Sequence, residues 1–292
     1  PIPPYLTDIN IGILFILGVS SVGVYGVILG GWASNNKFSL MGGLRSAAQL
    51  VSYEVPMGFS VVAVLLMAGS LSMVRIVEAR MEAGLWFVFP GIVAFFVYFV
   101  CGIAETNRNP FDLPEAESEL VAGYMSEYSG FRFALYFLVE WANLWIIGAV
   151  AVTLFLGGWQ IPGVDARAWA SLRGGGAFPA AAWWGMQVVS FAVFAVKTLF
   201  LVNVIIWIRW TLPRIRVDQM MNLCWKYLVP GAFATFVFTL LWQLLLGQVP
   251  ALATATGVVL SAAAAVVVGL FLKQTRENIS VIAHEKVDLS NW

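Results

Sequence analysis

The sequence has only two cysteines and one histidine, which limits the redox chemistry that the chain can perform alone. Cys101 lies within an apolar run, Cys224 lies near the edge of another, and His284 lies in the polar C-terminal tail. A four-ligand iron–sulfur cluster or a bis-histidine haem needs more of these side chains than the sequence contains. We therefore expect no metal centre held by this chain, and buried thiols at both cysteines.

Charge is also scarce. Charged residues make up 11% of the sequence, whereas soluble domains carry about 25%. Hydrophobic residues make up 60%, and they form continuous runs rather than the alternating pattern of a membrane β-barrel. The formal net charge is zero, which argues against nucleic acid as a partner. The sequence thus predicts an all-α polytopic membrane protein.

Seven apolar runs are each long enough to cross a bilayer, which takes about 20 helical residues. We expect these transmembrane helices at residues 9–32, 47–71, 85–104, 131–156, 184–208, 227–246 and 252–272. No soluble domain interrupts them, and no internal repeat of the kind found in many transporters is visible. Residues 1–292 are therefore predicted to form a single transmembrane domain.

The loops between these spans alternate between two sides of the membrane, and one side carries most of the sixteen lysines and arginines. By the positive-inside rule, that side faces the cytoplasm. It also carries the loop of residues 105–129 and the C-terminal tail. We expect a multi-pass protein of the bacterial inner membrane with that loop and the tail in the cytoplasm.

Residues 105–129 are unusually acidic. The acids are Glu105, Asp112, Glu115, Glu117, Glu119 and Glu127. A solvated loop would explain this charge. Disorder is a poorer explanation, because Phe111 and Leu113 are interleaved with the acids and need somewhere to pack. A third interpretation is an acidic lining for a polar path that enters the membrane.

Three ionisable residues fall inside predicted spans: Glu54, Glu140 and Lys197. Facing lipid would cost each about 2.5–3.5 kcal/mol, so we expect them to face protein or water. A carboxylate could form a structural ion pair with Lys197. Alternatively, the three groups could relay protons, because burial disfavours their charged forms. A passive membrane anchor would have little use for any of them.

A longer match gives these charges a context. Glu105-Thr-Asn-Arg-Asn-Pro-Phe-Asp-Leu-Pro-Glu-Ala-Glu-Ser-Glu119, continued by Leu-Val-Ala-Gly123, closely resembles the signature of the quinone-chamber membrane subunit (the mitochondrial subunit 1 family) of respiratory complex I, the proton-pumping NADH:quinone oxidoreductase. Further matching segments are Ser52-Tyr53-Glu54-Val55, Glu140-Trp141-Ala142-Asn143, Lys197 and Leu212-Pro213-Arg214-Ile215-Arg216-Val217-Asp218. The resemblance covers most of the chain from Asp8 to about Lys226.

The resemblance implies a membrane-arm subunit that forms the wall of the quinone chamber and the first part of the proton path. Quinone would be the substrate, and partner subunits would carry NADH, FMN and the iron–sulfur clusters. Those partners would be the peripheral-arm subunits at the quinone site and the antiporter-like membrane subunits. The implied proton path comprises Glu54, Glu105, Asp112, Glu115, Glu117, Glu119, Glu127 and Glu140, and we add Lys197 to it.

Contacts with the quinone itself are harder to assign. A quinone head needs apolar surfaces and a few polar groups, so Phe111 is the best aromatic candidate, with Arg45 as a second residue. Arg214 and Arg216, with Asp218, are expected to form structural ion pairs that hold acidic loops. The same basic residues could instead be ordinary positive-inside charge.

Two other functions fit parts of the pattern. Energy-converting hydrogenases contain a homologous membrane subunit, and a stand-alone ion transporter would also need polar groups inside its spans. The missing internal repeat argues against the transporter. Members of the complex I family begin with two more transmembrane helices, so we expect this sequence to lack an N-terminal part that carries some quinone-site residues.

Overall fold

The computed structural model describes residues 8–83, 87–88, 90–113, 120, 122–160 and 180–246, together with residues 259, 262, 266 and 273. This part of the chain contains helices and turns but no strand, which confirms the predicted all-α fold. The helices are α1 (Gly12–Ala33), α2 (Lys37–Ala68), α3 (Met73–Ala83), α4 (Ile92–Glu105), η1 (Gly123–Met125), α6 (Gly130–Phe155), α8 (Ala180–Thr211), α9 (Val217–Asn222), the π-helical η2 (Leu223–Leu228) and α10 (Val229–Leu246).

Five of the described helical segments are long and apolar enough to cross a membrane, so the chain is a membrane protein. They are Gly12–Ala33, Lys37–Ala68, Gly130–Phe155, Gln187–Thr211 and Val217–Leu244. The predicted span 85–104 corresponds to the shorter α4, which begins at Ile92. The predicted span 252–272 lies outside the described residues apart from three isolated positions, so the number of seven spans stays a prediction.

Two helices begin earlier than their apolar runs indicate. α2 begins at Lys37 rather than at residue 47, because the Asn36 side chain caps it by accepting a hydrogen bond from the Phe38 backbone N at 3.0 Å. The last described span begins at Val217 rather than at residue 227, since α9, η2 and α10 follow one another without a break. Both first turns contain charged or polar residues among the apolar ones, so a search for continuous apolar runs leaves them out.

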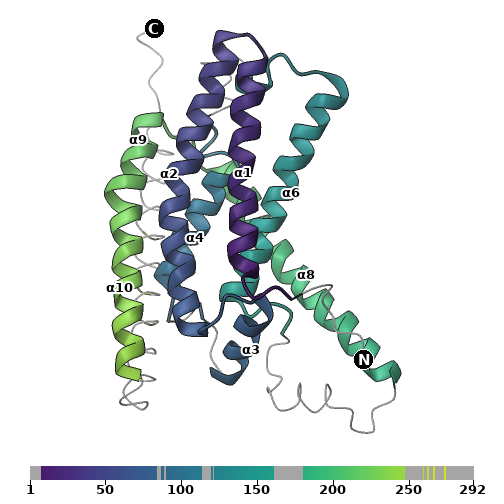
Figure 1. The fold of residues 1–292 in the computed structure, drawn as a ribbon, viewed down its shortest axis with the longest axis vertical. Coiled ribbons are helices and arrows are strands. Elements are labelled where there is room, and N and C mark those ends of the chain that lie inside the picture. Colours follow the sequence, from purple (N-terminus) through teal and green to yellow (C-terminus); the bar gives the residue numbers. More distant parts are fainter. Residues whose placement is uncertain are drawn as a thin grey trace, which may run out of the picture.

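Figure 1 shows α2 in the middle of the bundle, and it packs against α1, α4 and α10. α6 packs against α4, and α8 packs against α6 and slopes away from the other helices. The α1–α2 connection and the start of α6 lie at the same end of the bundle, at the top of Figure 1. That end is the one predicted to face the cytoplasm.

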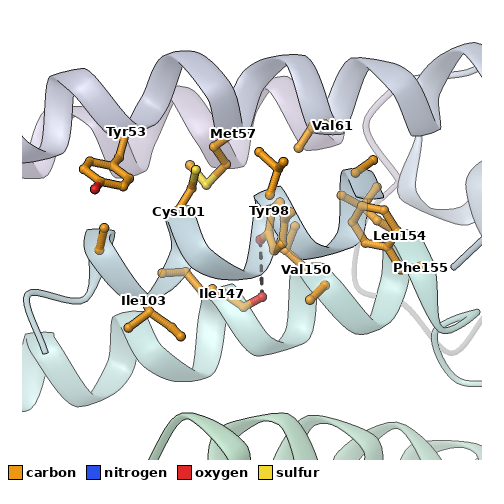
Figure 2. Packing of buried hydrophobic residues seen from close by; sticks show 14 of the residues in the cluster. Tyr53, Met57, Val61, Tyr98, Cys101, Ile103, Ile147, Val150, Leu154 and Phe155 are labelled. Atoms are coloured by element: carbon orange, nitrogen blue, oxygen red, sulfur yellow. Dashed lines mark hydrogen bonds between the residues drawn. The ribbon is translucent and has the colours of Figure 1, made fainter. Parts of the chain in front are cut away.

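The core lies between α2, α4 and α6 (Figure 2). Tyr98 of α4 donates a hydrogen bond from its hydroxyl to the backbone O of Ile147 at 3.3 Å, which satisfies a polar group in an apolar setting. Gly102 leaves room for the same Ile147, because a Cβ on Gly102 would lie 2.5 Å from Ile147 Cγ2. Cys101 and Cys224 are both fully buried, as predicted.

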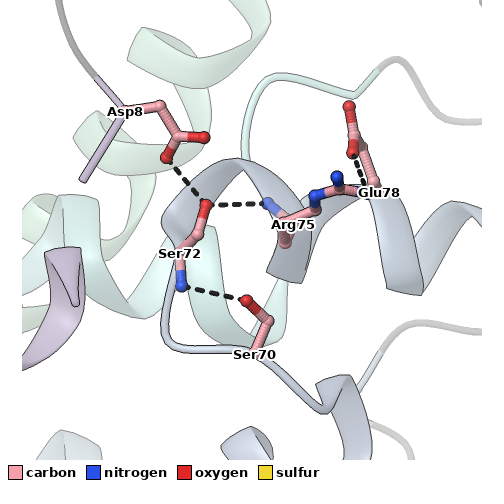
Figure 3. A network of polar contacts seen from close by, with 5 residues as sticks. All are labelled: Asp8, Ser70, Ser72, Arg75 and Glu78. Carbon is pink, nitrogen blue, oxygen red and sulfur yellow. Dashed lines mark hydrogen bonds and ion pairs between the residues drawn. The ribbon is translucent and has the colours of Figure 1, made fainter. Parts of the chain in front are cut away.

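Polar contacts fix the opposite end of the bundle, around the start of α3 (Figure 3). Ser72 Oγ donates to Asp8 Oδ1 at 2.7 Å and accepts from the backbone N of Arg75 at 3.3 Å. Its first bond ties the segment before α1 to α3, and its second caps α3. Arg75 also forms an ion pair with Glu78 at 3.9 Å. The sequence analysis did not predict α3.

A glycine contact sets the distance between α2 and η1. A Cβ on Gly42 would lie 2.9 Å from both Gly123 Cα and the Tyr124 backbone N. The hydrogen bond from Ser39 Oγ to the Gly123 backbone O, at 3.0 Å, holds the same approach. Gly123 has a φ of +54°, which L side chains rarely adopt. This contact fixes the position of Tyr124.

We expect Gly42→Ala to lower the free energy of unfolding by about 1–3 kcal/mol, because the new methyl group meets backbone atoms that cannot turn away. Gly58→Ala in the same helix is the matched control, since nothing lies within 4 Å of a Cβ there. Thermal unfolding of the purified protein in detergent measures both. Equal unfolding midpoints for the two variants would contradict this account of the contact.

Candidate functional site

A cavity of about 530 Å³ lies between α1, α2, α6, η1 and the end of α4. On α6 it extends from Arg132 to Asn143, a distance of about 16 Å along the helix axis. Arg132 is exposed, whereas the other end of the cavity lies against the last residues of α4. The cavity therefore leads from the end of the bundle predicted to be cytoplasmic into its interior.

Three of the predicted proton-path residues line this cavity: Glu54, Glu105 and Glu140. They come from the middle of α2, the end of α4 and the middle of α6, so only the fold brings them together. α4 ends at Glu105 because Asn107 takes a positive φ of 50°. Among the described residues, no group of three His, Cys, Asp or Glu side chains could hold a metal ion.

Glu140 forms a buried ion pair with Arg108, which belongs to the acidic segment (residues 105–129). Arg108 Nη2 lies 3.2 Å from Glu140 Oε2, and the two side chains are 7% and 10% exposed. The Tyr124 hydroxyl donates to Glu140 Oε1 at 3.2 Å. The Arg108 guanidinium also lies 5.5 Å from the centre of the Phe137 ring and 5.1 Å from that of Trp141, within the range of cation–π attraction.

Arg108 was not predicted as a site residue from the sequence, where Lys197 was the only partner considered for a carboxylate inside the spans. One signal was available: Arg108 is the single basic residue between positions 105 and 129. An arginine among six acids has carboxylates on either side of it in the chain. Its actual partner in the structure nevertheless comes from the following helix, and the sequence does not show that contact.

Hydrogen bonds from side chains to backbone carbonyls tie the start of the acidic segment to two other helices. Gln49 Nε2 donates to the O atoms of Ala104 and Phe111, at 2.7 and 2.8 Å. Asn109 Nδ2 donates to the O atoms of Arg209 and Leu212, both at 3.2 Å. Residues 104–111 are thereby fixed between α2 and the end of α8, and these residues do not form a freely solvated loop.

The remaining acidic candidates are distributed differently. Asp112 is half-buried, and Glu127 is exposed and accepts a hydrogen bond from Asn36 Nδ2 at 2.7 Å. Neither lines the cavity. Glu115, Glu117 and Glu119 lie outside the described residues. Their predicted roles in a proton path stay predictions.

The candidate quinone contacts do not line the cavity either. Phe111 is 4% exposed and packs edge-on against Tyr53, with ring centres 5.5 Å apart. Tyr53 in turn donates to the backbone O of Met220 at 3.1 Å. Arg45 is half-buried on α2. The structure gives Phe111 a packing role, and quinone contact by Phe111 or Arg45 stays a prediction.

The expected ion pairs of the segment before α9 also stay predictions. Arg216 and Asp218 are exposed, Arg214 is half-buried, and no ion pair of Arg216 or Asp218 occurs with the residues that the structure describes. Arg216 instead donates its backbone N to Gln219 Oε1 at 3.3 Å. Asp218 lies in the first turn of α9, where the helix dipole favours a negative charge.

Lys197 lies apart from the cavity and binds the chain that follows α6. Its Nζ donates to the backbone O atoms of Leu156, Gly158 and Gln160, at 3.0, 3.1 and 2.9 Å. Carbonyls at a helix C-terminus lack partners within the helix, so an ammonium group is a suitable donor there. Its place on a proton path stays a prediction.

Arg80 of α3 lies against the same turn, because a Cβ on Gly157 would lie 2.5 Å from its Nη1. Gly157 has a φ of +74°. Burial lowers the pKa of Arg80 to about 10, so its guanidinium remains charged at neutral pH. Two cations therefore face the turn after α6, where the negative end of the helix dipole lies.

We expect Arg108→Met to destabilise the protein by about 3 kcal/mol or more, because it removes the ion-pair partner of a buried carboxylate. The double variant Arg108→Met with Glu140→Gln should recover much of that loss, since the amide carries no charge. Unfolding midpoints of the two variants and of Glu140→Gln alone complete the comparison. A loss of stability in the double variant equal to the sum of the losses in the two single variants would show that the two residues are not coupled.

We expect Lys197→Met to lower the unfolding temperature by several degrees, because three carbonyls lose a charged donor. The measurement is thermal unfolding, with Lys226→Met, at the end of η2, as a control that also removes one lysine. A midpoint equal to that of the control would mean that these hydrogen bonds do not hold α8 to the end of α6.

Comparison with known proteins identifies the family. The family model described as NADH dehydrogenase matches residues 1–240. The chain is 54% identical to an NADH-quinone oxidoreductase H subunit of Anaeromyxobacter dehalogenans, over 98% of this chain and 70% of the relative. It is 45% identical to proteins of the same name from Bacteroides fragilis, over 80% of this chain and 63% of the relative, and from Magnetococcus marinus, over 78% and 61%.

The chain therefore spans less than two thirds of the length of the second and third of these relatives. The matched region nevertheless contains the acidic segment and all three carboxylates of the cavity. A match over this much of the sequence, together with the identity to the relatives, decides the family. The chain belongs to the NADH dehydrogenase family, whose members among these relatives are H subunits of NADH-quinone oxidoreductase.

Proposed function

We propose that this chain is the membrane-arm subunit of a proton-pumping NADH:quinone oxidoreductase that forms part of the quinone chamber and the first part of the proton path. The observation that carries the proposal is the shared cavity of Glu54, Glu105 and Glu140. Ionisable groups at membrane depth are costly, and they usually mark a path for protons, ions or substrate. Three of them around one cavity are more than packing requires.

The cavity has the properties that proton transfer needs. It has a volume of about 530 Å³, so it has room for several water molecules as well as the carboxylates. Ser20, Asn107 and Asn143 add polar groups to the wall. Water that bridges polar groups can connect donors and acceptors that do not touch directly. Glu54, Glu105 and Glu140 would act as successive proton carriers.

Quinone reduction would drive this path from the end at which the acidic segment lies. Electrons would come from a partner subunit, because this sequence has too few cysteine and histidine residues to hold an iron–sulfur cluster. A quinone that gains electrons becomes negative and makes nearby carboxylates hold protons more tightly. Protons would then move into the acidic segment and, through the cavity, toward the antiporter-like subunits.

In this proposal the acidic segment and the C-terminal tail face the cytoplasm, and the protein lies in the inner membrane of a bacterium. The excess of lysine and arginine on that side supports the orientation. The similarity to NADH-quinone oxidoreductase H subunits favours NADH:quinone oxidoreductase over the hydrogenase subunit that the sequence left open. The stand-alone transporter has no observation in its favour.

Glu54→Gln and Glu140→Gln test the function in the assembled complex. Each variant should lower NADH:quinone reductase activity and proton translocation in proteoliposomes together, by about tenfold or more, because it removes an acid–base group from the path. Electron transfer from NADH to ferricyanide should stay unchanged. The matched control is Glu78→Gln, a carboxylate of α3 outside the cavity. Full activity and full pumping in both cavity variants would rule the proposal out.

A further inference from the structure

Three tyrosines gather where η1 and the start of α6 meet α1, and the path described above makes no use of them. Tyr124, Tyr128 and Tyr136 all line the cavity. The ring centres of Tyr124 and Tyr136 are 5.6 Å apart, and those of Tyr128 and Tyr136 are 5.1 Å apart. Tyr136 is therefore the central member of a continuous aromatic cluster.

The hydroxyl groups of the cluster lie at the two ends of the ring contacts, beside α1 and beside Glu140. The Tyr124 hydroxyl donates to Glu140 Oε1 at 3.2 Å. The hydroxyls of Tyr128 and Tyr136 both lie beside Gly30 of α1. The Tyr128 hydroxyl also donates to the backbone O of Gly30 at 3.0 Å. Packing alone would be satisfied by phenylalanine, whereas here the hydroxyls of Tyr124 and Tyr128 each donate a hydrogen bond.

Gly30 is the point at which two of the hydroxyls meet. A Cβ there would lie 2.6 Å from the Tyr136 hydroxyl oxygen and 3.7 Å from that of Tyr128. The absence of a side chain at Gly30 thus lets both tyrosines reach the backbone of α1. The hydroxyls of Tyr128, which precedes α6, and of Tyr136, which lies within α6, are therefore both beside the same residue of α1.

Exposure changes steadily along the cluster. Arg132, at the outer end of the cavity, is exposed; Tyr128 and Tyr136 are half-buried; Tyr124 is 2% exposed. Glu140 lies beyond Tyr124 and is buried with Arg108. The cluster therefore connects a surface that water reaches with a carboxylate that the surrounding side chains cover.

We propose that Tyr128, Tyr136 and Tyr124 form a hydroxyl relay that carries protons between the exposed end of α6 and the Glu140 carboxylate. The inference rests on the proposed function, which needs a source of protons for the cavity. In each transfer a hydroxyl gives its own proton to the next acceptor and takes one from the preceding donor, with water bridging any gap. The last proton is taken up by the carboxylate, so charge and atoms balance.

Tyr136→Phe is the decisive variant, because it keeps the ring of the central residue and removes only its oxygen. In the assembled complex we expect proton translocation and NADH:quinone reductase activity to fall about tenfold, and their solvent deuterium isotope effect to change. Tyr124→Phe should behave in the same way. Electron transfer from NADH to ferricyanide and the unfolding temperature should both match those of the unmodified protein.

Tyr227→Phe, an exposed tyrosine of η2 outside the cavity, is the matched control. A wild-type rate and isotope effect in Tyr136→Phe would overturn the relay. So would a loss confined to Tyr124→Phe, since Tyr124 would then only position Glu140. Glu140→Gln distinguishes a failure of the relay from a failure of the proposed function. If it is inactive while Tyr136→Phe is normal, the relay fails alone; if both Glu140→Gln and Glu54→Gln are fully active, the proposed function fails as well.

Discussion

The buried ion pair between Arg108 and Glu140 is the contact on which the arrangement of the site depends. Removing two charges from water costs several kcal/mol for each, and the pair repays this only with good geometry and additional partners. Arg108 has two aromatic rings beside it, and Glu140 has the Tyr124 hydroxyl. The pair therefore joins the end of α4 to α6 and η1. Together with the hydrogen bonds of Gln49 and Asn109, the pair keeps residues 104–111 against the cavity.

The general class of the structure follows from composition, and so does the need for its intramembrane charges to have partners. Apolar runs predict helices, because the hydrocarbon core of a bilayer has no water and the backbone N–H and C=O groups must bond to each other. They do not locate helix ends. α2 begins directly after its Asn36 cap, and the last span begins in α9, because capping and polar turns extend a helix beyond its apolar part. α3 is short and polar, so a search for spans passes over it.

The sequence does not show which residue each buried side chain contacts. Glu140 and Lys197 both lie inside spans, and an ion pair between them would be the simplest way to neutralise both charges. In the structure Lys197 reaches three backbone carbonyls after α6, and a sequence pattern does not show carbonyl acceptors. Arg108 reaches Glu140 because the chain turns after α4. In the same way, Phe111 is in the core because Tyr53 lies opposite it. Each outcome depends on contacts between segments far apart in the chain.

Glycine serves two opposite purposes around the cavity, and the proposed proton transfer requires both. Gly42 lets α2 approach the backbone of η1 closely, which fixes Tyr124 beside Glu140. Gly23 and Gly26 line the cavity with nothing within 4 Å of a Cβ, so they leave space instead of closing it. A proton moves efficiently only between donors held at fixed positions, and water must be able to fill the distances between them. A bundle packed tightly everywhere would hold the donors in fixed positions but leave no room for water. The proposed path therefore needs both close helix contacts and open stretches of cavity wall.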